Sequence, residues 1–179
     1  MTARISIITG APGTGKSTVS EMVADFSPMD KSVHLHTDDF YHYLKKGAIP
    51  PHLSQSQNQN EVVMGAILKT AAHFAKNGYD VIVDGIVGPW FITPWKKLTW
   101  KEFKVNYFIL RAEKKVTLKR AALREKLSDS KNIELVESMW EQFNNLNDYE
   151  TNVIDTTYLT AEQTANLILE SMLTTKFSL

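Results

Sequence analysis

The sequence predicts an α/β domain built around a doubly wound, parallel, five-stranded sheet. Three observations favour this fold class: short apolar runs recur along the chain, helical patterns separate them, and the chain is long enough for one core. The apolar runs cover residues 5–8, 33–35, 81–83, 107–110 and 152–154. Strands that alternate with helices pair in parallel, and the helices cover the sheet.

The segments between these runs carry apolar residues at spacings of three and four, which predicts helices. The predicted helices cover residues 16–25, 61–76, 114–126, 134–147 and 161–173. Thr160 and Gln163 have the spacing of a capping box, and Gly78 follows a helix that ends near Asn77. Ligands bind at the carboxyl ends of the strands in such sheets, so the residues after each apolar run are the candidates for function.

The composition limits the partners. The chain has 179 residues, with 20 Lys and Arg against 20 Asp and Glu, and no cysteine. We expect a single domain over residues 1–179, without disulfides or thiolate chemistry. Because the net charge is zero, no global field attracts a polyanion, which disfavours nucleic acid. The apolar stretch before Gly10 is too short for a signal peptide or membrane span, so we expect a cytoplasmic monomer or homodimer without a membrane partner.

The first strand is followed by a phosphate-binding pattern. Residues 10–17 read GAPGTGKS and match G-x-x-x-x-G-K-[ST] between a predicted strand and a predicted helix. This P-loop pattern predicts ATP and Mg²⁺, with Lys16 on the β- and γ-phosphates and the Ser17 hydroxyl on the metal. The residues expected to contact the nucleotide are Gly10, Ala11, Pro12, Gly13, Thr14, Gly15, Lys16, Ser17 and Thr18.

Adjacent carboxylates follow the second strand. Asp38 and Asp39 lie at its predicted carboxyl end, near the expected γ-phosphate. Side chains alternate along extended chain, so we expect only one carboxylate to face the site. Asp38 is our candidate for the general base; Asp39 is the alternative, and a third reading is that both cap the next helix.

The third strand ends in Asp84 and Gly85, in the manner of a Walker B element. Asp84 is therefore a second candidate for holding Mg²⁺, through water; an Asp-Gly surface turn is the alternative. No glutamate follows the aspartate, unlike in ATPase motors.

Two further segments carry unusual residues. The region from Arg111 to Lys126 holds seven cations, and Arg120 and Arg124 are four residues apart, on one helical face. They could contact nucleotide and phosphate together, or lie on a solvated helix. The segment from Trp90 to Trp100 has tryptophans at intervals of five, which predicts irregular chain that either packs over the sheet edge or lines the substrate side.

The chain resembles the small P-loop kinases that include gluconate kinase, shikimate kinase, chloramphenicol phosphotransferase and uridine kinase. The resemblance covers nearly the whole chain and is carried by residues 10–17, 38–41, 84–85, 118–124 and 153–157. It implies a P-loop NTPase fold of the nucleoside and shikimate kinase type, and an enzyme that transfers phosphate from ATP to a small-molecule hydroxyl.

The resemblance also implies roles for individual residues. Asp38 would contact the acceptor hydroxyl, with Asp39 and Tyr41 as further substrate-binding residues. Arg120 and Arg124 would be catalytic residues of a small lid near residues 119–133. Asp155 and Thr156, with Thr157, would border the adenine.

The sequence leaves more than one class of phosphate acceptor open. The stretch after Asp38 resembles gluconate kinases, so gluconate or a related sugar acid is the leading acceptor. A nucleoside or an antibiotic stays open, because residues 38–41 resemble uridine kinases and residues 84–85 resemble antibiotic phosphotransferases.

Three other functional classes compete with this interpretation. A regulatory GTPase is disfavoured because the Asn-Lys-x-Asp motif is missing from the sequence. A nucleic-acid end kinase or toxin-like kinase is disfavoured because it would need a basic groove. A protein that binds ATP without catalysis stays open.

Overall fold

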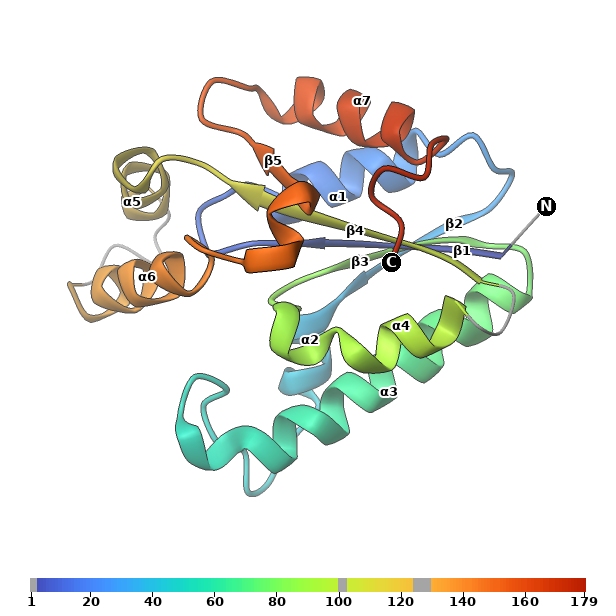
Figure 1. Ribbon diagram of the computed structural model, residues 1–179. Helices are drawn as coiled ribbons and strands as arrows, with labels where there is room; N and C mark the ends of the chain where they lie inside the picture. Colours follow the sequence, from blue (N-terminus) through green and yellow to red (C-terminus); the bar gives the residue numbers. More distant parts are fainter. Residues whose placement is uncertain (1–2, 100–102, 124–129) are drawn as a thin grey trace.

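A five-stranded sheet organises the protein, whose computed structural model describes residues 3–99, 103–123 and 130–179 (Figure 1). The strands are β1 Ala3–Thr9, β2 Ser32–His36, β3 Asp80–Asp84, β4 Phe103–Arg111 and β5 Val153–Asp155. They pair in parallel in the order β2-β3-β1-β4-β5. The predicted doubly wound parallel sheet is confirmed.

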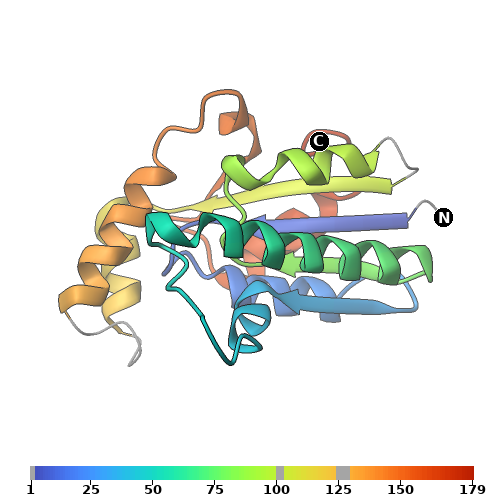
Figure 2. The same cartoon turned by 90° about the horizontal axis from the view of Figure 1, so that it is seen from below.

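Helices cover both faces of this sheet (Figures 1 and 2). One face carries α1 Lys16–Asp25 and α7 Ala161–Ser171, and the other carries α3 Gln57–Lys76 and α4 Thr93–Thr99. Three further helices, α2 Thr37–His42, α5 Lys114–Ala122 and α6 Ser130–Gln142, lie toward the carboxyl ends of the strands. The 3₁₀ helices η1 Ser54–Ser56, η2 Pro89–Phe91 and η4 Asn147–Asn152 complete the described elements.

The alternation of side chains along the strands divides the core into two clusters. In β1, Ile5 and Ile7 pack toward α3 and α4, while Ile8 packs toward α1 and α7. All three isoleucines are fully buried. Such continuous apolar strands are typical of parallel sheets covered on both faces.

The predicted helix boundaries are confirmed at both of the positions that carried a capping signal. The backbone N–H of Gln163 donates to the Thr160 hydroxyl over 3.1 Å, and the N–H of Thr160 donates to the Gln163 side chain over 2.9 Å. Gly78 follows α3 with a φ of 81°, a left-handed conformation that favours glycine.

Two sequence predictions about local structure are wrong. Asp38 and Asp39 lie within α2, not in extended chain. Residues 93–99 form α4 and are not irregular. The prediction considered only the interval of five between the tryptophans. The helical spacing is that of Trp95 and Leu98, which are three residues apart and bury one helical face against the sheet.

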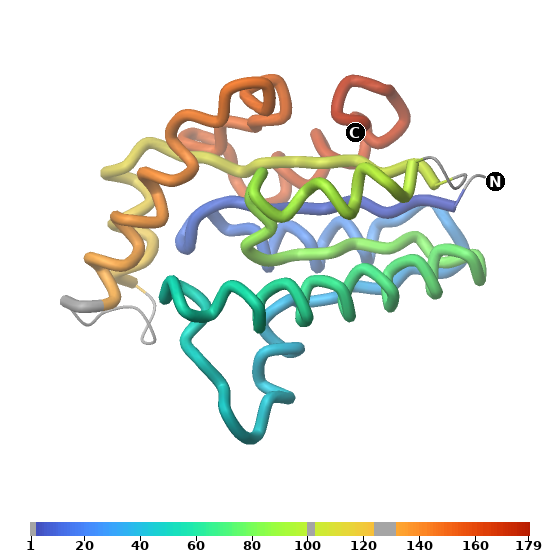
Figure 3. Tube along the Cα trace, turned by 60° about the horizontal axis from the view of Figure 1, so that its bottom comes forward, coloured from blue at the N-terminus to red at the C-terminus, as the bar shows by residue number. Residues whose placement is uncertain are grey.

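The connection between α2 and α3 projects as a loop from the body of the molecule (Figure 3).

No helix in the described ranges is long and apolar enough to cross a membrane.

A buried ion pair ties β1 to β3 at the amino ends of the strands. The Arg4 guanidinium donates to both carboxylate oxygens of Asp80, and the Ser27 hydroxyl donates to the same carboxylate over 2.6 Å. Asp80 is fully buried and Arg4 is nearly so. Each charge therefore depends on its partner in place of water.

We predict that Arg4→Met lowers the free energy of unfolding by about 3–5 kcal/mol, because the buried Asp80 charge loses its partner. Chemical denaturation followed by circular dichroism measures this change. The double variant Arg4→Met/Asp80→Leu, which buries no charge, should be more stable than the single variant. A single variant as stable as the parent would contradict the prediction.

Candidate functional site

The carboxyl ends of the strands meet at one edge of the sheet, and the residues predicted to be functional follow them. The loop of residues 10–15 follows β1, α2 follows β2, and Asp84 closes β3. In a parallel sheet this arrangement is a direct consequence of the strand direction.

The loop after β1 has the geometry of an anion site. Gly13 and Gly15 have φ of 87° and 89°, in the left-handed region that favours glycine. The Thr14 hydroxyl donates to the Ala11 carbonyl over 2.9 Å and closes the turn. The N-cap residue of α1, Gly15, makes no side-chain capping hydrogen bond, and the start of a helix is where backbone N–H groups bind phosphate. Lys16 and Ser17 are half-buried at this point. These features fit a phosphate group.

The loop is packed too closely for larger residues. A Cβ on Gly10 would lie 2.2 Å from the Leu110 carbonyl oxygen of β4, and one on Gly13 would lie 2.8 Å from the Thr117 carbonyl oxygen of α5. The phosphate loop is therefore held between the end of β4 and α5.

Asp84, the last residue of β3, is part of a polar cluster that the sequence analysis did not anticipate. It is fully buried, and its two oxygens contact His34 Nε2 at 3.1 Å and His36 Nδ1. Burial alone would raise the pKa of Asp84, but hydrogen bonds from both histidines and their charge hold it below its ordinary value. The sequence signal for this cluster was the His-x-His pattern of β2, followed later in the chain by a strand that ends in Asp84.

The role of Asp84 as a magnesium ligand stays a prediction. Both of its oxygens already have imidazole partners in this structure. Across the described residues, three or more His, Asp or Glu side chains are nowhere grouped to hold a metal. Ser17, at the start of α1, is the other candidate ligand.

The two carboxylates of α2 are distinguished by the cavity and not by strand alternation. Because α2 is helical, Asp38 and Tyr41 share a face, and both line the cavity described below. Asp39 is exposed and lies outside its lining. Asp38 Oδ2 is also 3.5 Å from His36 Nε2, which links it through His36 to Asp84. Burial, and secondly the charge of Asp38, raise the pKa of Tyr41 to about 12, so its hydroxyl remains a donor at neutral pH.

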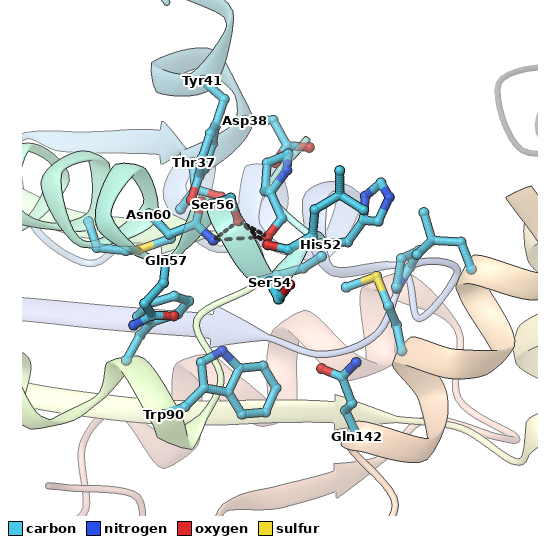
Figure 4. A pocket seen from close by; sticks show the side chains of 18 of the residues that line it. Thr37, Asp38, Tyr41, His52, Ser54, Ser56, Gln57, Asn60, Trp90 and Gln142 are labelled. Carbon is cyan, nitrogen blue, oxygen red and sulfur yellow. Dashed lines mark hydrogen bonds between the residues drawn. The ribbon is translucent and has the colours of Figure 1, made fainter. Parts of the chain in front are cut away.

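A cavity of about 520 Å³ lies in front of the phosphate loop (Figure 4). Its wall combines Pro12 of the loop with residues of α2, the segment 51–57, α3, η2 and α6. Figure 4 shows Trp90 and Gln142 on one side, and Tyr41, Ser56 and Asn60 on the other. Sequence reasoning left open whether Trp90 packs or lines the site; it lines the cavity, while Trp95 is buried.

Arg120 and the expected adenine edge lie together on the other side of the loop. Arg120 Nη2 donates to the carbonyl oxygens of Thr156 and Thr157 over 3.1 and 3.4 Å. Hydrogen bonds from the Thr157 hydroxyl and backbone N–H lower the pKa of Asp155. The buried hydroxyl oxygen of Thr156 has no hydrogen-bond partner. These contacts give Arg120 a fixed position; a contact with nucleotide stays a prediction.

The rest of the predicted lid is only partly within the described residues. Arg124 lies outside them, as do Lys126 and Trp100. Within them, Lys114 pairs with Glu137 and Glu141 of α6 over 2.6 and 2.8 Å. Arg111 pairs with Glu150 over 2.8 Å. These cations of the basic stretch therefore serve to join neighbouring elements.

Solved structures share this fold. The tunicamycin resistance protein of Deinococcus radiodurans is 20% identical, with a TM-score of 0.69 over 94% of this chain and 95% of its own. The APS kinase of Mycobacterium tuberculosis, solved with AMPPNP and APS, is 14% identical, with a TM-score of 0.72 over 97% and 99%. A gluconokinase of Sinorhizobium meliloti 1021 is 13% identical, with a TM-score of 0.65 over 96% and 92%. At these identities the likeness shows the fold alone.

The expected resemblance to P-loop kinases is thereby confirmed for the fold, whereas the specific likeness to gluconate kinases is not. No curated protein matches the sequence. The family model described as Zeta toxin matches residues 3–156 and spans the phosphate loop, the cavity and Arg120. Toxin-like kinases had been disfavoured on net charge, and this match corrects that inference. The chain belongs to the zeta toxin family.

Proposed function

We propose that this protein is an ATP- and Mg²⁺-dependent phosphotransferase that moves the γ-phosphoryl group onto a hydroxyl group of a small molecule. The main support is the shared cavity: Pro12 of the phosphate loop and Asp38 of α2 both line it. A phosphoryl donor at the loop and an acceptor in the cavity would be neighbours. Transfer between bound reactants depends mostly on such positioning.

The reaction assigns a task to each group. The acceptor oxygen forms a bond to the γ-phosphorus while the bond from that phosphorus to the β–γ bridging oxygen breaks, and ADP leaves. Asp38 accepts the hydroxyl proton. Lys16 and the backbone N–H groups of the loop stabilise charge on the phosphates. Mg²⁺, when bound with the nucleotide, neutralises phosphate charge, and Ser17 is the residue that would hold it.

The nature of the acceptor is part of the proposal. The sequence favoured gluconate or a related sugar acid, with a nucleoside or an antibiotic as alternatives. The proposal carries no role for nucleic acid or membrane.

We expect acceptor-dependent transfer of labelled γ-phosphate from ATP to a small molecule. The test compares sugar acids, nucleosides, aminoglycosides and oligonucleotides, each with and without Mg²⁺. Transfer to a small molecule only when Mg²⁺ is present supports the proposal. Transfer confined to oligonucleotides would contradict it.

Lys16→Ala should reduce phosphoryl transfer by at least about 100-fold, because stabilisation of phosphate charge is a large part of catalysis. The fold should be kept, since Lys16 is half-buried and outside both core clusters. Initial rates at saturating ATP and Mg²⁺ measure the effect, and circular dichroism checks the fold. Comparable rates in the two proteins would mean that the loop does not serve transfer.

Asp38→Asn should lower kcat by about 10²–10⁴-fold, because the amide keeps the size of the side chain but cannot take a proton. ATP binding, measured by calorimetry, should change little because residues 10–17 are untouched. Asp39→Asn is the matched control and should retain activity, since Asp39 does not line the cavity. If Asp39→Asn abolishes transfer and Asp38→Asn does not, the two assignments are reversed.

A further inference from the structure

The buried carboxylate of Asp84 engages two imidazoles of β2. One of its oxygens contacts His34 Nε2 at 3.1 Å, and the other contacts His36 Nδ1. Burial raises the pKa of Asp84, but the bonds from the two imidazoles bring it below its ordinary value. The carboxylate is therefore ionised at neutral pH and can only accept hydrogen bonds. It follows that His34 carries a hydrogen on Nε2, whereas His36 carries one on Nδ1.

The parallel register of β2 and β3 brings these three side chains together. His36 pairs with Asp84, and His34 lies two residues earlier on the same strand. Residues two apart along a strand point to the same face of the sheet. The imidazoles are partly covered, with 25% and 32% of their side-chain surface exposed, and Asp84 is fully buried. The cluster therefore lies where the sheet itself holds it in place.

The free edge of the His36 ring meets the carboxylate that serves as base in the proposed reaction. With Nδ1 bonded to Asp84, the other ring nitrogen, Nε2, lies 3.5 Å from Asp38 Oδ2. The Asp38 side chain is 62% exposed, so packing leaves it several rotamers. An imidazole that is fixed from behind restricts this choice. Within the described part of the chain, the polar contact of His34 is with Asp84 and not with Asp38.

The backbone between His36 and Asp38 is restrained as well. Thr37, the first residue of α2, is 1% exposed and lines the cavity beside Asp38 (Figure 4). Gly85 directly follows β3, and a Cβ on it would overlap the Thr37 side chain. The end of β3 therefore packs directly on the start of α2. Together with the bond from Asp84 to His36, this contact anchors the residues on the amino side of Asp38.

We propose that His36 is a positioning residue for the base: Asp84 fixes the His36 imidazole, and the imidazole holds the Asp38 carboxylate in the orientation that reaches the acceptor hydroxyl. This inference rests on the proposed function, because Asp38 is the base of that reaction. A base must lie within hydrogen-bond reach of the proton it takes, and a misplacement of about 1 Å can cost about 10²-fold in rate. The role of His36 is the same whether or not Asp84 also holds Mg²⁺ through water.

The first experiment separates orientation of Asp38 from support of the strand. His36→Asn keeps an amide N–H near the place of Nδ1, where Asp84 can accept it, and removes the part of the ring that faces Asp38. His34→Asn is the matched control, because it removes an imidazole and its Nε2 bond to the same carboxylate.

His36→Asn should lower kcat about 10–100-fold while the KM for ATP changes little, because the phosphate loop is untouched. His34→Asn should keep kcat near that of the parent protein. Initial rates with the identified acceptor measure both effects, and circular dichroism checks the folds. Equal losses of kcat in the two variants would assign the effect to the strand and overturn the role of His36.

The second experiment asks whether His36 acts through Asp38. In a protein that already carries Asp38→Asn, the added change His36→Asn should lower kcat no further, because the group that it positions can no longer take a proton. A further loss of about 10–100-fold would show that His36 acts on another group and would overturn the inference.

The third experiment does not depend on turnover. Long-range ¹H–¹⁵N NMR spectra of the imidazoles are compared in the parent chain and in Asp38→Asn, whose substituted side chain is largely exposed and outside both core clusters. The His36 Nε2 resonance should move, the His34 resonances should stay, and His36 Nδ1 should carry a hydrogen. An unmoved His36 Nε2 resonance would overturn the inference.

The outcomes separate this inference from the proposed function. Equal transfer rates in His36→Asn and the parent protein would overturn the inference and leave the proposed function standing. If no compound accepts phosphate, the proposed function fails, while a shifted His36 Nε2 resonance still supports the contact that orients Asp38.

Discussion

The parallel pairing of β1 with β3 and β4 is the constraint on which the rest of the site depends. Its register aligns Ile8 with Asp84 on one side and Thr9 with Ile109 on the other. The chain after Thr9 therefore emerges between the ends of two neighbouring strands. Contact with the Leu110 carbonyl leaves space only for glycine at residue 10. The same pairing fixes the phosphate loop and the Asp84 carboxylate with respect to each other.

Hydrogen bonds to β1 and β4 also place the aromatic side of the cavity. The Thr9 hydroxyl accepts from the Val87 N–H over 2.9 Å, and the Tyr107 hydroxyl donates to the Val87 carbonyl over 2.7 Å. Both bonds are buried, so they hold the turn after β3 firmly. That turn leads directly into η2 and sets where Trp90 meets the cavity. The position of Trp90 in the cavity wall thus depends on polar bonds to the sheet.

The contrast between net charge and local charge explains one failure of the sequence analysis. A net charge of zero describes the field far from the molecule, which governs long polyanions. It says nothing about which side chains line one cavity. Lys114 and Arg111 of the basic stretch pair with carboxylates of α6 and η4, while the cavity wall holds Asp38. Net charge was therefore a poor guide to family membership, although the zeta toxin match is clear.

The sequence by itself determined the succession of strands and helices along the chain, the phosphate loop and the helix caps. Each of these depends on neighbours within a few residues. Short apolar runs identified all five strands, and the glycine pattern identified the loop. The tertiary structure decided what depends on distant residues meeting. It placed Asp38 in a helix, engaged Asp84 with two histidines of another strand, and left Asn60 Oδ1 unpaired in a cavity wall. No local pattern encodes such contacts, because they arise only when β2, β3 and α3 pack together.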